Sequence, residues 1–358
     1  MRRGMKRTAA LVGRVLGIVL AVFVLLIVVL TVTEHTPEPE EELVITNVQE
    51  KEVKPGESFS VLTWNIGYGT LGDNADFFMD GGKMVSSASK ERVQQNMDGI
   101  AGVLKELQPE IVFLQEVDLD SKRSHSINEQ RFLEQELNGY CDSFAANYKV
   151  LYVPYPIPPI GKVECGLTTF SQYRVVDAVR VALPCPFHYP VRIANPKRCV
   201  MVNRIPVEGS DKYLVLVNLH LEAYDDGEGK LAQTKMLSDL LQKEVEKGNY
   251  VIASGDFNQS FSNVDTSAYP ILDEELWAPG SIDVAEFGDD LTFHTDNTEP
   301  SCRSLDRAYA GADHENFQYY LIDGFIVSSN IRVESVETIN YEFAYSDHNP
   351  VRMTVTLE

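Results

Sequence analysis

The stretch IASGDFNQS, residues 252–260, decides the fold of this chain. Its apolar and small residues are typical of a strand that runs into Gly255, after which Asp256 and Asn258 flank Phe257. An acid and an amide in an exposed loop would be ordinary turn formers. At the end of a strand they could instead be aimed into a cleft, because the sheet fixes the backbone behind them. The rest of the chain has to decide between these interpretations.

Strands and helices alternate from Phe59 onward. Recurring apolar residues at three- and four-residue spacing predict helices over 93–107 and 231–245. Short apolar runs predict strands in FSVLTWNI (59–66), IVFLQEV (111–117), YKVLYV (148–153), GLTTF (166–170), KYLVLVNLHL (212–221), NYVIASGDFN (249–258), YYLIDGFIVS (319–328), RVESVETI (332–339) and PVRMTVTLE (350–358). No composition shift divides residues 59–358, so we expect one mixed α/β domain there.

The N-terminus has the pattern of a membrane anchor. Residues 1–14 form a basic tail, and residues 15–33 carry no charge over a length that a helix would extend to about 28 Å, close to a hydrocarbon core of about 30 Å. Cations precede this run and glutamates follow it. The positive-inside rule therefore predicts a single-pass membrane protein with a cytoplasmic N-terminus and an extracellular domain after residue 34.

The alternative for the apolar run is a cleaved signal peptide. Such a peptide has a shorter apolar core and a small-residue cleavage site, and only Thr31-Val32-Thr33 resembles one here, which favours the retained helix. Residues 34–58 are rich in Glu, Pro and Lys and predict a linker. Extended, that linker reaches at most about 80 Å, enough to hold the domain near the membrane but not flat against it.

Charge and cysteine content limit the partners. The formal net charge of the 358 residues is −22, and because residues 1–14 contribute five cations, the exported part is at −27. This charge argues against a basic surface that binds nucleic acid, although bound metal ions could supply the positive charge that such binding needs. The five cysteines are odd in number and none has the Cx2C spacing of a structural zinc site.

Several predicted strands end in polar residues of a related kind. Carboxylates and an amide are the hard oxygen donors that Mg²⁺ or Ca²⁺ prefers. Imidazoles can transfer protons near neutral pH, and a carboxylate can orient an imidazole. Metal, base and acid together describe hydrolysis of a phosphate ester. The residues are Asn65, Glu116, His220, Asp256, Asn258, Asp323, Asp347 and His348.

The order of these segments resembles a known family. TWNI, LQEV, GLTTFS, NLHL, GDFN, LIDGFIVS and SDHNPV are similar, in order and spacing, to the motifs of the endonuclease/exonuclease/phosphatase superfamily, the deoxyribonuclease I-like group. The resemblance covers residues 59–358. It implies a four-layer α/β sandwich, in which two packed mixed β-sheets are flanked by helices, preceded here by the transmembrane helix. It also implies an Mg²⁺-dependent phosphoric ester hydrolase, with Mn²⁺ or Ca²⁺ as alternative ions.

The resemblance further implies a role for each residue. Glu116 would be the main metal ligand, with Asn65 and Asp347 close to the metal. Asp256 and Asn258 would position the attacking water and the phosphate. His348, polarised by Asp323, would lie opposite the metal, and the general base stays open between His348 and Asp256. His220 would donate a hydrogen bond to a phosphoryl oxygen or protonate the leaving group.

The superfamily resemblance does not identify the substrate, which depends on loops. Neither a lipid-inserting hairpin nor a basic DNA-gripping loop is recognisable, and VPYPIPPIG (153–161) is interpreted as a proline-rich connector. The glycine-rich loop 69–89 is a substrate lid or a loop that packs its own aromatics. Lys122 and Arg123 contact a phosphate or lie in a solvated loop.

Anchoring and acidity favour phospholipid head groups or small organic phosphates as substrates. An exported nuclease acting on DNA or RNA is the alternative, and a non-catalytic binding module of the same fold is a minor one. The predicted partners are the phosphoester substrate and, through the N-terminal helix, the membrane; no protein partner is predicted.

Overall fold

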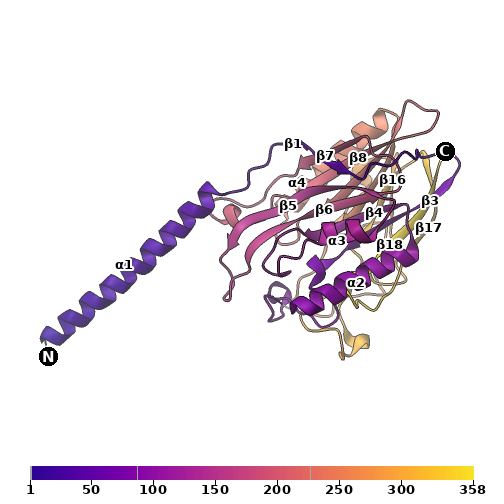
Figure 1. Cartoon of the computed structure of the whole chain (residues 1–358). Helices are drawn as coiled ribbons and strands as arrows, with labels where there is room; N and C mark the ends of the chain where they lie inside the picture. Colours follow the sequence, from indigo (N-terminus) through magenta and orange to yellow (C-terminus); the bar gives the residue numbers. More distant parts are fainter. Residues whose placement is uncertain (1, 87, 226) are drawn as a thin grey trace.

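Two mixed β-sheets pack face to face in the part of the chain that the structure describes (Figure 1). The structure is a computed structural model that describes residues 2–86, 88–225 and 227–358. The first sheet has the order β1 (Glu40–Glu42), β7 (Asp177–Ala182), β8 (Cys199–Pro206), β9 (Tyr213–His220), β10 (Tyr250–Asp256), β16 (Asp323–Ser328), β13 (Leu291–His294). The second has the order β17 (Ile331–Thr338), β18 (Val351–Leu357), β3 (Ser58–Asn65), β4 (Ile111–Asp118), β6 (Gly161–Ser171), β5 (Cys141–Val153), β2 (Ile45–Thr46).

Helices cover the outer face of each sheet and complete four layers. The helix α4 (Glu228–Glu246) packs on the first sheet, and α2 (Lys90–Leu107) and α3 (Glu129–Glu136) pack on the second. Short pairs and turns fill the loops: β11 (Gln259–Phe261) with β12 (Gly280–Ile282), β14 (Cys302–Arg303) with β15 (Tyr319–Tyr320), and the 3₁₀ turns η1 (Gly67–Gly69), η2 (Phe78–Asp80), η3 (Val191–Ala194), η4 (Val284–Phe287) and η5 (His314–Asn316). The predicted four-layer α/β sandwich is confirmed.

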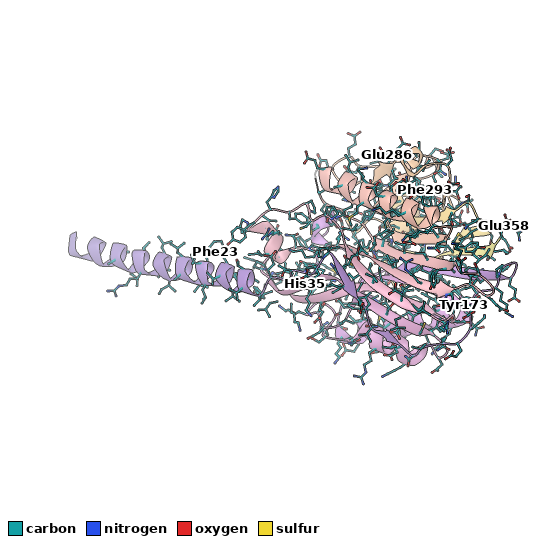
Figure 2. All side chains as sticks on the ribbon, turned by 90° about the horizontal axis from the view of Figure 1, so that it is seen from above. Phe23, His35, Tyr173, Glu286, Phe293 and Glu358 are labelled. Atoms are coloured by element: carbon teal, nitrogen blue, oxygen red, sulfur yellow. The ribbon has the colours of Figure 1, made fainter. Side chains whose placement is uncertain are left out.

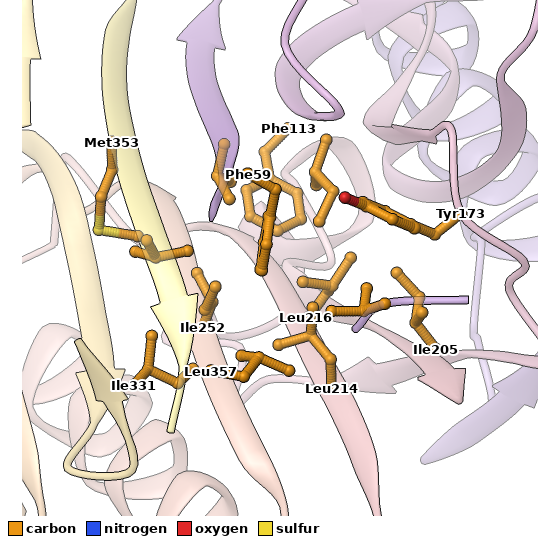
Figure 3. Close-up of a cluster of buried hydrophobic side chains, with 14 of the residues drawn as sticks. Phe59, Phe113, Tyr173, Ile205, Leu214, Leu216, Ile252, Ile331, Met353 and Leu357 are labelled. Carbon is orange, nitrogen blue, oxygen red and sulfur yellow. The ribbon is translucent and has the colours of Figure 1, made fainter. Parts of the chain in front are cut away.

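The main core lies between the two sheets. Phe59 and Phe113 of the second sheet face Leu214, Leu216 and Ile252 of the first (Figure 3). Because side chains alternate along a strand, other residues of β3 and β4, among them Trp64 and Leu114, pack with α2 instead. Strand β10 is buried on both faces, which explains its unbroken apolar sequence.

Two parallel strand pairs determine where the site forms. Strand β3 pairs with β4, and β9 pairs with β10, both in parallel, with α2 and α4 as the crossover helices. Parallel strands end at the same edge of a sheet. The polar residues that follow all four strands are therefore brought to one edge of the sandwich.

Gly255 has a specific role in the opening stretch. Its φ of 154° is disfavoured for other residues, and a Cβ there would overlap the carbonyl oxygen of Leu219 on β9. Only glycine lets β10 approach β9 closely just before Asp256. The glycine of GDFN thus sets the position of the acid that follows it.

The N-terminal helix α1 (Arg2–Val32) projects from the sandwich (Figures 1 and 2). Its segment Ala10–Val32 is long and apolar enough to cross a membrane. Its last turns touch the domain: Leu30 is only 2% exposed and packs with Val150, Val153 and Ile193.

The structure corrects the prediction that residues 34–58 form a linker. Within it β1 pairs with β7 and β2 pairs with β5, so this one segment adds an edge strand to each sheet. The physical reason is that Leu43 and Ile45 pack against the inter-sheet core and Val53 is fully buried in it, despite the surrounding Glu and Pro residues. The domain is therefore not held on a free tether.

All five cysteines are free thiols, and only Cys185 of the five is exposed.

Candidate active site

Strand register places three predicted site residues side by side. Asp256 at the end of β10 lies opposite His220 of β9 and Asp323 of β16. In the other sheet Asn65 of β3 lies opposite Gln115, so that Glu116 is the next residue along β4.

Residues at the ends of these strands line one pocket of about 100 Å³. Asp323 is the single predicted site residue that does not line it, since Asp323 lies behind His348. The predicted residues that line it are Asn65, Glu116, His220, Asp256, Asn258, Asp347 and His348.

Two of the lining residues have left-handed backbone. Glu116 has φ of 57° at an irregularity in the pairing of β4 with β6, and Asn258 has φ of 51°. Residues other than glycine adopt this region at an energetic cost, and such residues cluster at functional sites. At Glu116 the irregularity changes the direction of the side chain at the strand end.

Asp256 contacts four of the other predicted site residues. Its Oδ2 accepts a hydrogen bond of 3.0 Å from Asn65 Nδ2 and lies 3.4 Å from His220 Nε2 and 3.8 Å from His348 Nε2. Its Oδ1 accepts from the backbone N–H of Asn258 at 2.8 Å. The Asn258 amide in turn donates to the carbonyl of residue 221 at 3.0 Å, which fixes its side chain.

His348 is held from behind by Asp323. Its Nδ1 donates to Asp323 Oδ2 at 2.8 Å, and both side chains are buried. Ser301 Oγ accepts from the backbone N–H of Asp323 at 3.2 Å, and an isolated β-bridge joins Cys302 to His348. The ring is therefore oriented with Nε2 toward Asp256 and the pocket.

The two imidazoles differ in charge near neutral pH. Burial alone would lower the pKa of His348, but the Asp323 carboxylate overrides it and raises this pKa well above the ordinary value. Burial, with the nearby Arg198 cation, holds the pKa of His220 well below its usual range. His348 is therefore a cation and His220 a neutral ring.

The pKa values of three carboxyl groups in the pocket are all raised. Burial raises the pKa of Asp256 to about 6 against the opposing charge of His348. Burial, assisted by Asp347 and Asp256, raises the pKa of Glu116 to about 7 even though Arg123 opposes it. The pKa of Asp347 is also raised by burial. Three carboxyl groups thus share one pocket in which negative charge is unfavourable, and a bound cation would relieve it.

The donor set fits a hard divalent cation. Glu116 accepts no hydrogen bond from any described residue, and it shares the pocket with Asp347 and the amide of Asn65. No group of three or more acid, His or Cys side chains in the described ranges is arranged to hold an ion. Mg²⁺ commonly binds one or two carboxylates and completes its shell with water and substrate oxygens. Two carboxylates and an amide oxygen therefore suit Mg²⁺, and Mn²⁺ or Ca²⁺ by the same chemistry.

The pocket also contains residues that the motifs did not predict. Arg198 lines it, pairs with Glu222 at 3.1 Å and donates to the carbonyl of residue 220 at 3.1 Å. Loop 69–89 contributes Phe77 and Asp80 to the lining, and Tyr224, Trp277 and Tyr320 line the pocket as well. The Tyr224 hydroxyl donates to Asp80 at 3.0 Å, and burial raises the pKa of Asp80 to about 7. The loop also packs its own aromatics, because the rings of Phe77 and Phe78 lie edge to face at 4.8 Å and Phe77 packs against the cluster of Tyr68, Leu71, Ala75 and Leu305.

Lys122 and Arg123 serve the structure rather than a phosphate. Arg123 donates two hydrogen bonds to Asp118, at 3.1 and 3.0 Å, and its guanidinium lies 3.5 Å from the centre of the Tyr68 ring. Lys122 donates to the carbonyl of residue 159 at 3.4 Å. Neither lines the pocket.

Comparison with known proteins agrees with this geometry. The profile of the Endonuclease/Exonuclease/phosphatase family matches residues 62–348, from β3 to His348. The chain belongs to this family. Members of the endonuclease/exonuclease/phosphatase family are nuclease- or phosphatase-type hydrolases of phosphoester bonds and typically depend on divalent metal. Among curated proteins none matches the chain significantly.

Solved structures of the endonuclease/exonuclease/phosphatase family share the fold at low sequence identity. A protein from Beutenbergia cavernae is 20% identical, with a TM-score of 0.56 over 84% of this chain and 72% of its own. A Bacteroides vulgatus protein is 18% identical, with a TM-score of 0.54 over 84% of this chain and 100% of its own. The human Nocturnin catalytic domain, solved with a bound sulfate anion, is 16% identical, with a TM-score of 0.52 over 88% and 98%.

Proposed function

We propose that this protein is an Mg²⁺-dependent phosphoester hydrolase, anchored in a membrane by α1, whose extracytoplasmic domain acts on phospholipid head groups or small organic phosphates. The observation that carries the proposal is that one pocket combines groups of opposite charge. The His348–Asp323 pair contributes a cation to its lining, and Glu116 and Asp347 contribute two carboxyl groups. A phosphoryl group with a metal ion matches both kinds of group.

The protonation states support a role for each residue. Asp256, with a pKa of about 6, is the group placed to take the proton from an attacking water. His348 is already protonated and stabilises charge on the phosphoryl oxygens. His220 is neutral and donates a hydrogen bond to one of those oxygens. The water oxygen bonds to phosphorus as the bond from phosphorus to the leaving oxygen breaks.

The remaining residues position these groups. Asn65 and Asn258 fix the two oxygens of Asp256. A divalent ion held by Glu116 and Asp347 would polarise a phosphoryl oxygen. This leaves Asp256, rather than His348, as the general base.

The cations near the pocket favour a small or lipid substrate over a polynucleotide. Arg198 is paired with Glu222, and Arg123 with Asp118. Arg303 donates to backbone carbonyls of residues 71, 72 and 75. These side chains are satisfied within the protein, and the net charge of −22 adds no basic track for a nucleic-acid backbone.

The test is hydrolysis by the full chain in phosphatidylcholine nanodiscs with Mg²⁺. Phospholipid, small phosphate esters, plasmid DNA and RNA are compared, with His348→Ala as the control. The full chain is needed because residues 34–58 contribute strands to both sheets. Release of head groups or small phosphates supports the proposal. Nicking of nucleic acid alone would identify a nuclease, and no hydrolysis of any substrate would favour a binding module.

A further inference from the structure

A group of exposed apolar side chains surrounds the point where α1 meets the domain. The long hairpin of β5 and β6 carries several of them, and η3 with the residue before its cap carries the others. Ile157 at the hairpin turn is 93% exposed and Tyr155 is 69% exposed. We call the set the hairpin patch: Leu151, Tyr152, Tyr155, Ile157, Tyr189 and Val191. Such side chains are costly to leave in water when they are grouped.

The helix end is fixed against the base of this patch. Leu26, Ile27 and Leu30 of α1 pack with the cluster that includes Val153 of the hairpin and Ile193 of η3. Figure 1 shows β5 and β6 reaching toward the end of α1.

Polar contacts secure the same junction. Glu34, just beyond the helix, pairs with Arg192 at 3.3 Å and Lys197 at 3.1 Å. The hydroxyls of Thr31 and Tyr189 are 3.4 Å apart. The helix and the hairpin patch therefore keep a defined relative position.

That position determines the depth of the patch, given the proposed membrane anchor. Arg14 is the last charge before the apolar run, so the span begins near Val15 and needs nearly all residues to 33 to cross about 30 Å of hydrocarbon. Leu26 to Val32 rises only about 9 Å. The domain residues that contact Leu26 and Leu30 must then lie at the outer boundary of the bilayer.

We propose that the hairpin patch inserts into the outer membrane–water interface, so that the catalytic domain rests on the lipid surface. The partner is the bilayer itself, and the contact is apolar. Nearby cations are already paired, Lys149 with Glu164 and Lys162 with Asp120, so binding does not need anionic lipid. Tyrosines suit this interface because their rings are amphipathic.

The patch also touches the rim of the pocket. The rings of Tyr155 and Phe78 are 5.8 Å apart in an edge-to-face contact, and Phe78 begins η2, the turn that carries Asp80 into the pocket. The surface that meets the lipid is therefore adjacent to a loop that lines the site. The VPYPIPPIG segment, interpreted from sequence as a connector, is this lipid-contacting turn.

The experiment measures depth and is independent of catalysis. In a Cys185→Ser background, a fluorescent NBD label is attached to Ile157→Cys or, as the control, to Glu358→Cys at the opposite end of the molecule from α1 (Figure 2). The full chain is placed in nanodiscs of zwitterionic phosphatidylcholine, with or without nitroxide-labelled lipid. We expect blue-shifted emission and severalfold stronger nitroxide quenching at position 157 than at position 358.

Each outcome has a distinct meaning. Equal quenching at the two positions, in protein that stays in the nanodisc, would overturn the insertion and leave the anchor intact. Loss of the chain from the nanodisc would overturn the anchor and the insertion together. A second variant, Leu151→Ser with Ile157→Ser, should raise KM for a phosphoester in the bilayer and leave KM for a soluble ester unchanged. An equal change for both esters would contradict the surface role.

Discussion

Replacing Asp323 by asparagine tests the charge relation at the centre of the site. The substitution keeps the shape of the side chain and an oxygen that can accept from His348 Nδ1, but it removes the negative charge. With an effective dielectric constant of about 20, unit charges 2.8 Å apart attract by about 6 kcal/mol. Burial of both groups offsets part of this attraction, and the neutral hydrogen bond remains. We expect a net loss of about 3 kcal/mol in the transition state, or about 100-fold in kcat.

The assay is hydrolysis of bis(p-nitrophenyl) phosphate by the full chain in nanodiscs, with thermal unfolding measured in parallel. Asp211→Asn is the matched control, because Asp211 has a side chain that is 87% exposed and loses the same charge. A fall in kcat with little change in KM and no change for the control is the expected result. If Asp323→Asn keeps more than about a tenth of the parental kcat, the proposed role of a protonated His348 is wrong.

Three further predictions concern other parts of the account. His220→Ala removes a neutral donor and should reduce kcat by about 100-fold or more while circular dichroism is unchanged; parental turnover would exclude His220 from the chemistry. Gly255→Ala forces a Cβ against the Leu219 carbonyl and should destabilise the fold by several kcal/mol in urea unfolding, and an unchanged midpoint would contradict the close approach. Hydrogen bonds from Arg204, among others, lower the pKa of Glu244 to about 2 in spite of burial, whereas an unfolded Glu titrates near 4.3. The ionised Glu244 side chain therefore contributes at most about 3 kcal/mol to the free energy of unfolding. This contribution is complete above about pH 5 and is lost as the pH falls toward 2. Glu244→Gln should lose less stability than the parent between pH 7 and 3, and equal losses would contradict this.

The site could be predicted from sequence because its residues follow strands directly. Asn65, Glu116, His220 and Asp256 each come at the end of an apolar run, and parallel pairing brings such ends to one edge. The apolar periodicity likewise predicted the helices α2 and α4 but not α3, and the layered arrangement was implied by the family resemblance. These features are local, so that short stretches of sequence are enough to indicate them.

The rest depends on long-range packing that short stretches do not encode. Arg198 and Trp277 reach the pocket from loops with no motif of their own. Strands β1 and β2 span three and two residues, too few for a periodic pattern, and they form because the edges of larger sheets are available to pair with them. The docking of Leu30 on the hairpin likewise joins residues more than a hundred positions apart.

The most direct test of the central claim is the metal dependence of turnover in the parent and in Glu116→Ala. The full chain in nanodiscs is treated with EDTA, dialysed and supplied again with Mg²⁺, and hydrolysis of bis(p-nitrophenyl) phosphate is followed. The account predicts that EDTA abolishes parental turnover, that Mg²⁺ restores it, and that Glu116→Ala remains folded and inactive by orders of magnitude at every Mg²⁺ concentration. Parental turnover that survives chelation, or a Glu116→Ala variant that Mg²⁺ activates as it does the parent, would contradict it.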